Sequence, residues 1–192
     1  MKTFILLLAA LILSACGKKE NSNILPPAPT SIPLLSVTKT LSKTMTNTSE
    51  PMVALNTTNG QIVLKLYTDS APKTVANFLA KVNAGFYNGL IFHRVIAGFM
   101  AQGGDPLGTG TGGGTQVSEI NTRPFVRGTI GLARGSDKAF SNDSQFFICF
   151  TTDGCQHLTS DYVNFGEVVS GLDVLDQIVQ GDKIINLTTT TK

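Results

Sequence analysis

Short apolar runs dominate the chain from residue 90 onward, and they constrain its fold more than any other feature. Each run has four to six residues between polar or glycine-rich segments; the runs are 90–95, 98–101, 129–133, 146–150 and 164–169. Runs this short are typical of β-strands, because helices usually need about ten residues or more. Nineteen glycines and eleven phenylalanines indicate tight turns around an aromatic core. We therefore predict a mainly β fold, with a last strand at 183–187.

An alternating pattern around Asn59-Gly60 predicts that the strands begin with a β-hairpin. Asn-Gly is a strong short-range signal for a tight turn between antiparallel strands. The alternating apolar residues on its two sides are Val53, Leu55, Ile62, Leu64 and Leu66. Alternation places these side chains on one face of the hairpin, where a core can bury them.

Two other segments have the spacing of amphipathic helices. Ser70 as N-cap and Pro72 in the first turn predict a helix of about fourteen residues that stops at Gly85. Its apolar face consists of Val75, Phe78, Leu79 and Val82. A second helix is predicted over 171–179, with Ser170 as its cap and a buried face of Leu172, Leu175, Ile178 and Val179. Two helices among about eight antiparallel strands predict a closed eight-stranded barrel capped by the helices, because closure removes exposed sheet edges.

The N-terminal residues 1–15 have the pattern of a secretory signal peptide. One lysine precedes an apolar stretch, 4–13, that is about half the roughly 20 residues a membrane-spanning helix needs. A buried core helix is the alternative, but the stretch lacks an amphipathic pattern and a cap. The segment Leu13-Ser14-Ala15-Cys16 resembles the bacterial lipobox, which implies that Cys16 is acylated and anchors the chain to a lipid membrane.

The anchor and the segment after it determine where we expect the protein to act. Gly17 is not the Asp that commonly retains lipoproteins at the inner membrane of Gram-negative bacteria, so we expect the outer membrane or its periplasmic face where two membranes exist. Residues 16–51 are rich in polar residues and proline without a helical or strand period, which indicates a flexible tether. The sequence therefore predicts a lipid-anchored protein of the bacterial cell envelope.

The remaining residues, 52–192, are expected to form one domain. A chain of 192 residues is long enough for one such domain and a leader. The formal net charge is only +2 and 15% of the residues are charged, so no basic surface points to nucleic acid. We expect a monomer with no nucleic-acid partner.

Several segments of this domain resemble the signature sequences of cyclophilins, which are peptidyl-prolyl cis–trans isomerases. The matching stretches are FHRVIAGFMAQGGD at 92–105, GTIGLARG at 128–135, SQFFI at 144–148, NFGEV at 164–168 and GLDVL at 171–175. With TVANF at 74–78, the likeness spans about 52–187 in the family's order and spacing. It implies an eight-stranded antiparallel barrel capped by two helices, and an enzyme that rotates X-Pro bonds in exported proteins and assists their folding.

The resemblance also implies a site for proline-containing peptides and unfolded proteins. The matching positions with a catalytic role are Arg94, His93 and Gln102. Those that bind the substrate are Phe99, Met100, Ala133, Arg134, Gln145, Phe147, His157, Leu158 and Tyr162. Many cyclophilins have Trp where this chain has His157, which implies weak cyclosporin binding. Tyr162 stands where others have His, and Arg134 where eukaryotic members often have Asn.

The chemistry of X-Pro rotation explains why an arginine is the candidate catalytic group. Conjugation of the amide creates a barrier of about 18–20 kcal/mol to rotation. A guanidinium that donates hydrogen bonds to the twisted amide nitrogen or to the carbonyl would lower it, and Arg94 is the candidate. The reaction needs no covalent intermediate, metal or cofactor, so we expect none.

Each site residue also has an interpretation without function. Without the family resemblance, Phe99, Met100 and Phe147 at strand spacing would be core residues. Arg94 by itself would be a solvated surface charge. The histidines and cysteines lack the spacing of metal ligands, so we predict no metal site. A non-catalytic proline-peptide-binding chaperone would keep the pocket but lose the arginine, which this chain retains. A surface interaction module that depends mainly on the anchor stays open.

Two further features carry predictions outside the site. The glycine run 108–114 matches G-x-G-x-x-G, but no helix and no Lys-Ser/Thr pair follows it, so we expect a mobile surface loop rather than a phosphate-binding turn. Cys149 and Cys155 can pair in an oxidising compartment. We expect instead that Cys149, at the end of a predicted core strand, is a buried free thiol.

Overall fold

The computed structural model describes residues 50–190 of the chain. The predicted signal peptide, the acylation site Cys16 and the tether up to residue 49 lie outside the described residues. Among residues 50–190, none of the helices has the length and apolar character needed to cross a membrane.

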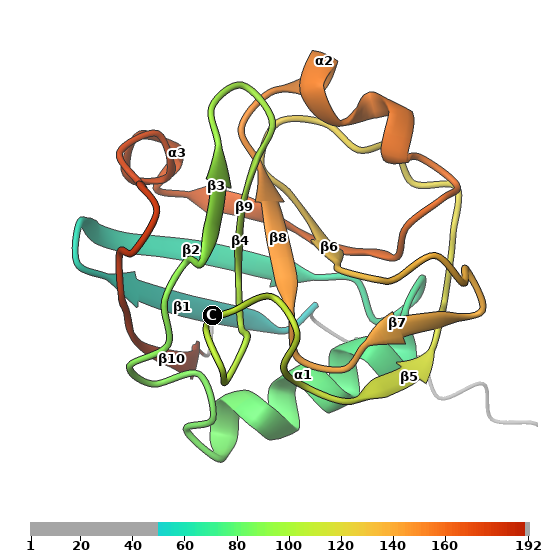
Figure 1. The fold of residues 1–192 in the computed structure, drawn as a ribbon, viewed down its shortest axis with the longest axis horizontal. Helices are drawn as coiled ribbons and strands as arrows, with labels where there is room; N and C mark the ends of the chain where they lie inside the picture. Colours follow the sequence, from blue (N-terminus) through green and yellow to red (C-terminus); the bar gives the residue numbers. More distant parts are fainter. Residues whose placement is uncertain (1–49, 191–192) are drawn as a thin grey trace, which may run out of the picture. The chain divides into compact units, whose positions relative to one another are not determined.

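An eight-stranded antiparallel sheet forms the body of the domain (Figure 1). In spatial order its strands are β10 (Ile184–Thr190), β1 (Met52–Thr57), β2 (Gly60–Leu66), β9 (Asn164–Ser170), β6 (Thr129–Leu132), β8 (Phe146–Cys149), β4 (Met100–Gly103) and β3 (Arg94–Ile96). A separate two-stranded sheet pairs β5 (Thr115–Val117) with β7 (Phe140–Asn142). The predicted fold class is confirmed, and the pair β5–β7 is an addition that the short apolar runs did not indicate.

The two ends of the large sheet meet through one short bridged contact rather than a ladder between named strands. The segment before β3 forms one isolated bridge, Ile91 with Lys183, next to β10. Four backbone hydrogen bonds support it. Ile184 N–H donates to Leu90 O and Gly89 N–H to Ile184 O, both at 2.8 Å, while Phe92 N–H donates to Asp182 O at 2.9 Å and Gly181 N–H to Phe92 O at 3.0 Å. The predicted closed barrel is therefore only partly closed. Its edge strand β3 has three residues and pairs with β4, and it forms no ladder with β10.

The opening hairpin forms as predicted, with its turn one residue earlier. Thr57 pairs with Gly60, so Thr58 and Asn59 make the two-residue loop. The Thr57 hydroxyl accepts a hydrogen bond from Asn59 N–H at 3.1 Å and donates one to Gly60 O at 2.9 Å. Gly60 has φ +137°, a conformation that residues with a Cβ rarely adopt. The glycine is thus needed as the first residue of β2 and not inside the turn.

Helix α1 (Pro72–Asn83) buries the predicted apolar face, but its N-terminus is capped from a distance. Ala71 occupies the N-cap position and Ser70 does not cap the helix. Glu119 accepts hydrogen bonds from the N–H groups of Lys73 and Thr74 at 3.1 and 2.7 Å. A carboxylate at this place satisfies two free N–H groups and complements the helix dipole. The sequence prediction missed it because Glu119 is 45 residues away from Thr74.

The predicted second helix is much shorter than expected. Helix α3 covers only Leu172–Leu175, and Gly171 with φ +87° stands at its N-cap, so Ser170 is the end of β9 and not a cap. Leu175 and Ile178 are buried as predicted, but Val179 is 61% exposed. The structure adds helix α2 (Thr152–Cys155), followed directly by the 3-10 helix η1 (Gln156–Leu158). Figure 1 shows α1 and α2 on opposite sides of the domain.

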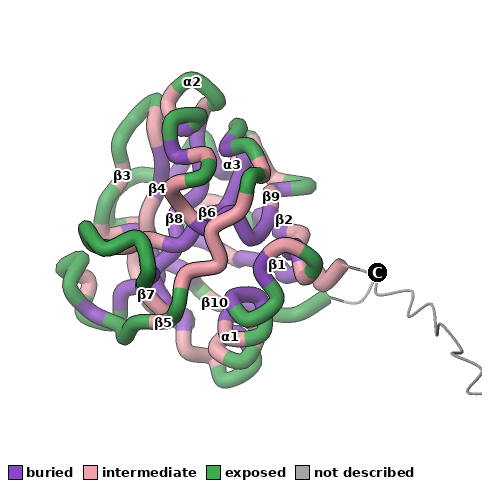
Figure 2. Tube along the Cα trace, turned by 90° about the vertical axis from the view of Figure 1, so that its right-hand side faces the viewer, coloured by how far each residue is buried: buried purple, intermediate pink, exposed green. Residues whose placement is uncertain are grey.

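The buried apolar side chains form two clusters. The larger one, here called the barrel core, lies between the sheet and α1 and includes Leu55, Leu64, Phe78, Phe146 and Phe165. The smaller one, here called the second cluster, consists of Met100, Phe125, Phe147, Cys149, Cys155 and Leu158, with Phe99 and Tyr162 packed against it. Figure 2 shows that buried positions follow the strands while the connecting loops are mostly exposed. The neighbours Phe146 and Phe147 of β8 point into different clusters.

Candidate active site

A small cavity of about 220 Å³ collects most of the predicted site residues. Its lining is made of Arg94, Phe99, Met100, Gln102, Ala133, Arg134, Phe147, His157, Leu158 and Tyr162. The strands β3, β4 and β8 supply one side of this lining, and η1 supplies His157 and Leu158. Ten of the twelve predicted residues thus meet although they are spread over almost seventy positions of the sequence.

The floor of the small cavity is apolar and tightly packed. Met100, Phe147 and Leu158 are 2%, 4% and 6% exposed. The ring of Phe147 stacks on Phe125 with centroids 5.7 Å apart, and it meets the edge of Tyr162 at the same distance. A cavity with rigid aromatic walls is suited to a small apolar ring such as that of proline.

A chain of polar side chains runs along the rim. Arg94 is exposed and its Nη1 donates to Gln102 Oε1 at 3.4 Å. Gln102 Nε2 donates to Gln145 Oε1 at 2.9 Å, and Gln145 Nε2 donates to Gly112 O at 2.9 Å. Within the described residues only Nη1 of Arg94 has a hydrogen-bond partner, so the remaining guanidinium N–H groups can bind a ligand. The relay orients both amides beside the cavity.

Arg134 is held in a different way from Arg94. Its Nε donates to Asp161 O at 2.9 Å and its Nη1 to Gly135 O at 2.8 Å. The guanidinium also lies over the ring of Tyr162, 4.3 Å from the centroid. These contacts keep the Arg134 side chain on the wall of the cavity and occupy part of its donors.

A second, larger cavity of about 550 Å³ adjoins the first. It shares Gln102, Ala133 and Arg134 with the small cavity, and Gln145 is also part of its lining. A peptide in the small cavity can therefore extend into the larger one past residues common to both.

His93 is the one predicted site residue that lines neither cavity. Both of its ring nitrogens are buried and have no partner in the described structure. Desolvation lowers the pKa of His93 and Arg94 adds to this, while the carboxylate of Asp105 acts in the opposite direction. The neutral imidazole is therefore favoured, and His93 stands behind the site and not at the cavity surface.

The glycine loop 108–114 is fastened by side chains that the sequence analysis did not single out. The buried carboxylate of Asp105 accepts hydrogen bonds from the N–H groups of Leu107, Thr109 and Gly110. Asn142 Nδ2 donates to Gly112 O at 3.0 Å. The loop lies at the surface as predicted, and these bonds together with that from Gln145 Nε2 to Gly112 O connect its backbone to the site. The available signal was an aspartate just before a turn, a residue that often accepts from the following N–H groups.

Cys149 and Cys155 form a disulfide, which corrects the prediction of a free thiol at Cys149. Their Cα atoms are 6.1 Å apart, within the usual range for such a bond. Sequence analysis placed Cys149 correctly in a core strand, but the turn through α2 that returns Cys155 to it was not visible in the sequence. Among the described residues, no group of three or more His, Cys, Asp or Glu side chains is arranged to hold a metal ion.

Comparisons with known proteins agree with this geometry. The family model described as cyclophilin type peptidyl-prolyl cis-trans isomerase/CLD matches residues 52–190. A peptidyl-prolyl cis-trans isomerase of Helicobacter pylori is 47% identical over 137 residues, covering 68% of this chain and 81% of the relative. A probable peptidyl-prolyl cis-trans isomerase of Brucella suis is 42% identical over 151 residues, covering 71% and 76%. The crystal structure of a Cryptosporidium parvum cyclophilin in the presence of the dipeptide Ala-Pro is 31% identical, with a TM-score of 0.67, and the match covers 73% of this chain and 99% of that one.

Proposed function

The chain belongs to the family of cyclophilin-type peptidyl-prolyl cis–trans isomerases, and we propose that it rotates X-Pro bonds of exported proteins in a bacterial cell envelope, with Arg94 as the catalytic group. The isomerase activity follows from the family and from relatives of the same name at 42–47% identity. The single observation that supports the assignment to Arg94 is its place at the rim of the small cavity, where guanidinium N–H groups other than Nη1 have no partner in the described residues and can bind a substrate.

Arg94 acts on the electronic structure of the X-Pro amide. Rotation removes the conjugation and leaves a lone pair on the amide nitrogen, which can then accept a hydrogen bond. A guanidinium N–H donor placed at this nitrogen, or at the carbonyl oxygen, stabilises the twisted amide more than the planar one. No bond is made or broken in the substrate apart from this rotation.

The small cavity supplies the rest of the stabilisation. An acceleration of about a hundred-thousandfold needs about 7 kcal/mol, which is more than one hydrogen bond contributes. Phe99, Met100, Phe147 and Leu158 hold the proline ring in place, so that the residue before it turns relative to a fixed ring. We assign Gln102 and Gln145 to the substrate backbone, since Gln102 lines both cavities and Gln145, hydrogen-bonded to it, lines the larger one.

The other wall residues have smaller roles in this proposal. Ala133 and Arg134 present backbone groups to the peptide, and Tyr162 closes the rim with a flat, polar-tipped ring. His157 has a smaller ring than the Trp of strongly cyclosporin-sensitive cyclophilins, so the proposal includes weak cyclosporin binding. His93 supports Arg94 from behind instead of touching the substrate.

We also propose that acylated Cys16 anchors the protein to a membrane and that residues 16–51 act as a tether. The support is the lipobox-like segment that ends at Cys16 and the polar composition that follows it. The Cys149–Cys155 disulfide adds an independent argument, because disulfides persist in oxidising compartments and are rare in cytosolic proteins. The substrates would then be proline-containing segments of exported, unfolded proteins. The protein would meet them as a monomer anchored at the outer membrane or its periplasmic face.

Exchange NMR of a short Ala-Pro peptide tests the catalytic proposal. The purified full chain should accelerate cis–trans exchange, and Arg94→Ala should lower the catalysed rate about 100-fold while remaining folded. Arg123→Ala is the matched control, because Arg123 is a half-buried arginine that pairs with Asp69 and lines neither cavity. A folded parent that binds the peptide without changing its exchange would instead make the site a binding module.

Cell fractionation tests the anchor. The full chain expressed in a Gram-negative host should be recovered with the membranes and should incorporate radiolabelled palmitate. Cys16→Ser should do neither, while Cys149→Ser retains Cys16 and should still be labelled. Labelling of Cys16→Ser at the level of the parent would refute acylation at this residue.

A further inference from the structure

The disulfide lies directly behind the small cavity. Cys149 is the last residue of β8, two positions after Phe147, and Cys155 is the last residue of α2, two positions before His157. Both cysteines are fully buried within the second cluster, which also contains Met100, Phe147 and Leu158 from the cavity floor. The disulfide thus joins β8, which supplies Phe147 to the cavity, to α2, which is followed directly by η1 with His157 and Leu158.

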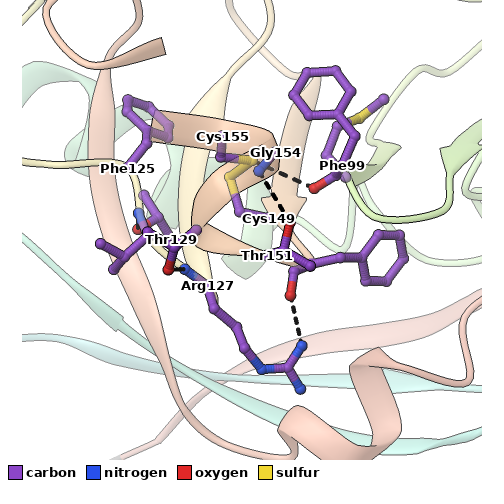
Figure 3. The surroundings of a disulfide bond; sticks show 12 residues. Phe99, Phe125, Arg127, Thr129, Cys149, Thr151, Gly154 and Cys155 are labelled. Atoms are coloured by element: carbon purple, nitrogen blue, oxygen red, sulfur yellow. Dashed lines mark hydrogen bonds between the residues drawn. A yellow bond between two sulfur atoms is a disulfide. The ribbon is translucent and has the colours of Figure 1, made fainter. Parts of the chain in front are cut away.

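The disulfide also touches the main chain of a cavity residue. Figure 3 shows the carbonyl oxygen of Phe99 facing Cys155, and the Sγ atom of Cys155 is 3.4 Å from it. A disulfide sulfur carries no proton, so this is a packing contact in the oxidised protein. The Phe99 carbonyl already accepts a hydrogen bond from Phe150 N–H at 2.8 Å, which keeps it in place. Cys155 therefore packs against a carbonyl that cannot turn away.

The segment that carries His157 and Leu158 is held at its two ends and by a few side chains between them. Helix α2 has four residues and η1 has three, and such short helices are not stable by themselves. Within 152–158 only Cys155 and Leu158 are buried, while His157 is exposed. Thr151 caps α2 through a hydrogen bond from Gly154 N–H at 3.1 Å and donates to Gly98 O at 2.6 Å. These bonds fix the start of the segment, and Phe125 N–H donates to Thr159 Oγ1 at 3.0 Å just past its end. Between these ends, the disulfide at Cys155 and the side chain of Leu158 are its buried attachments to the domain.

We propose that the Cys149–Cys155 disulfide positions the wall of the small cavity, so that the oxidised enzyme binds proline peptides more tightly than the reduced enzyme. The inference rests on the proposed function, because it assigns the small cavity to the proline ring. Cys149 and Cys155 are positioning residues that act through Leu158 and His157. The catalytic Arg94 is on β3, outside the joined elements, and keeps its place when the disulfide is opened.

Reduction supplies the physical cause of the weaker binding. A dithiol such as dithiothreitol transfers two electrons to the disulfide; the S–S bond breaks, each cysteine sulfur takes one proton, and the dithiol closes to a cyclic disulfide. Two thiols cannot remain at bonding distance, because non-bonded sulfur atoms repel each other there. Cys155 must move away from Cys149, and the short η1 that follows it moves with it. Leu158 then packs less closely on the proline ring.

The experiment compares the oxidised full chain with the same protein after reduction by dithiothreitol, with thiols counted by alkylation and mass spectrometry. Affinity for an Ala-Pro peptide is measured by NMR titration, and the catalysed exchange rate is measured at saturating peptide. We expect the dissociation constant to rise about tenfold on reduction, as for the loss of part of one side chain's packing. The rate at saturation should stay within about twofold, since Arg94 is unaffected.

The double variant Cys149→Ala/Cys155→Ala is the matched control. It should bind the peptide as weakly as the reduced parent and should not respond to dithiothreitol. Because it keeps Cys16, it also controls for any action of the reductant on that residue. Backbone amide spectra of β1, β2 and β9 report that the barrel core is intact in every sample.

Two outcomes would overturn the inference. If complete reduction leaves the dissociation constant unchanged while the melting temperature falls, the disulfide has only a structural role. If the double variant binds as tightly as the oxidised parent, the crosslink does not position the wall. Failure of the proposed function looks different, because the oxidised parent and Arg94→Ala would then have the same catalysed rate whatever the state of the cysteines.

Discussion

The barrel core and the second cluster are both buried and apolar, but they are built in different ways. The barrel core is formed by long strands and α1, whose apolar residues repeat with a clear period, and it contains several phenylalanines. The second cluster contains only six residues, contributed by β4, β8, α2, η1 and the loop that carries Phe125. One of its contacts is covalent. The comparison indicates that the barrel core holds the fold while the second cluster shapes the wall that meets the substrate.

Neighbouring residues of β8 offer the sharpest way to separate the two regions. Phe146→Ala removes a ring that meets Phe78 and Tyr87 at centroid distances of 5.8 and 5.7 Å in the barrel core. We expect it to cost about 3–5 kcal/mol, which is comparable to the whole stability of many domains. Urea unfolding followed by circular dichroism measures this. A loss below about 1 kcal/mol would mean that the barrel core is not the main source of stability.

Phe147→Ala should instead affect binding more than folding. Its ring forms the floor of the small cavity and packs on Phe125 and Tyr162. We expect peptide affinity to fall about 30-fold, because the ring faces the substrate, with a smaller loss of stability than for Phe146→Ala. NMR titration with the Ala-Pro peptide and urea unfolding give the two numbers. The division between the two regions fails if Phe147→Ala destabilises the domain as much as Phe146→Ala.

Glu119, which caps α1 from a distant part of the sequence, offers a test of the barrel core with a smaller expected loss of stability. Glu119→Ala leaves the N–H groups of Lys73 and Thr74 without their acceptor. Loss of a helix cap costs about 1 kcal/mol, so stability should fall by that amount while peptide affinity is unchanged. Glu119→Gln retains an acceptor oxygen and should recover part of the loss. A change in affinity in either variant would show that α1 is coupled to the site.

The smallest expected effect concerns His93, which lines neither cavity and lies behind the site. Desolvation lowers its pKa in the folded protein below the ordinary value of about 6.5. The unfolded chain therefore binds a proton first as the pH falls, so His93 contributes stability above about pH 6.5 that is lost on acidification. His93→Gln should lose less stability than the parent between about pH 7.5 and 5.5. Parallel urea titrations at the two pH values measure the difference, and equal losses would contradict the assignment.

Sequence patterns predicted the parts of the molecule that repeat locally. The alternation around Asn59-Gly60 and the spacing along α1 required the buried faces that the structure has, because period and burial are linked within one element. The resemblance to cyclophilins predicted the ten residues that line the small cavity, seven of them within the matching segments. The second helix was predicted less well. The apolar spacing over 171–179 suggested a full helix, but α3 ends after one turn and leaves Val179 exposed.

Features that join distant segments were decided by the tertiary structure. Glu119 at the start of α1, Asp105 under the glycine loop and the pairing of Cys149 with Cys155 each depend on where a turn brings the chain back. The residue types permit these contacts but do not specify them, because a hydrogen bond or a disulfide requires positions within a few ångströms that only packing provides. The sequence by itself determined the family, the mainly β fold class and the residues of the small cavity. The order of the strands, the closeness of the cavity residues and the crosslink behind them were decided by the folded chain, because they depend on contacts between distant segments.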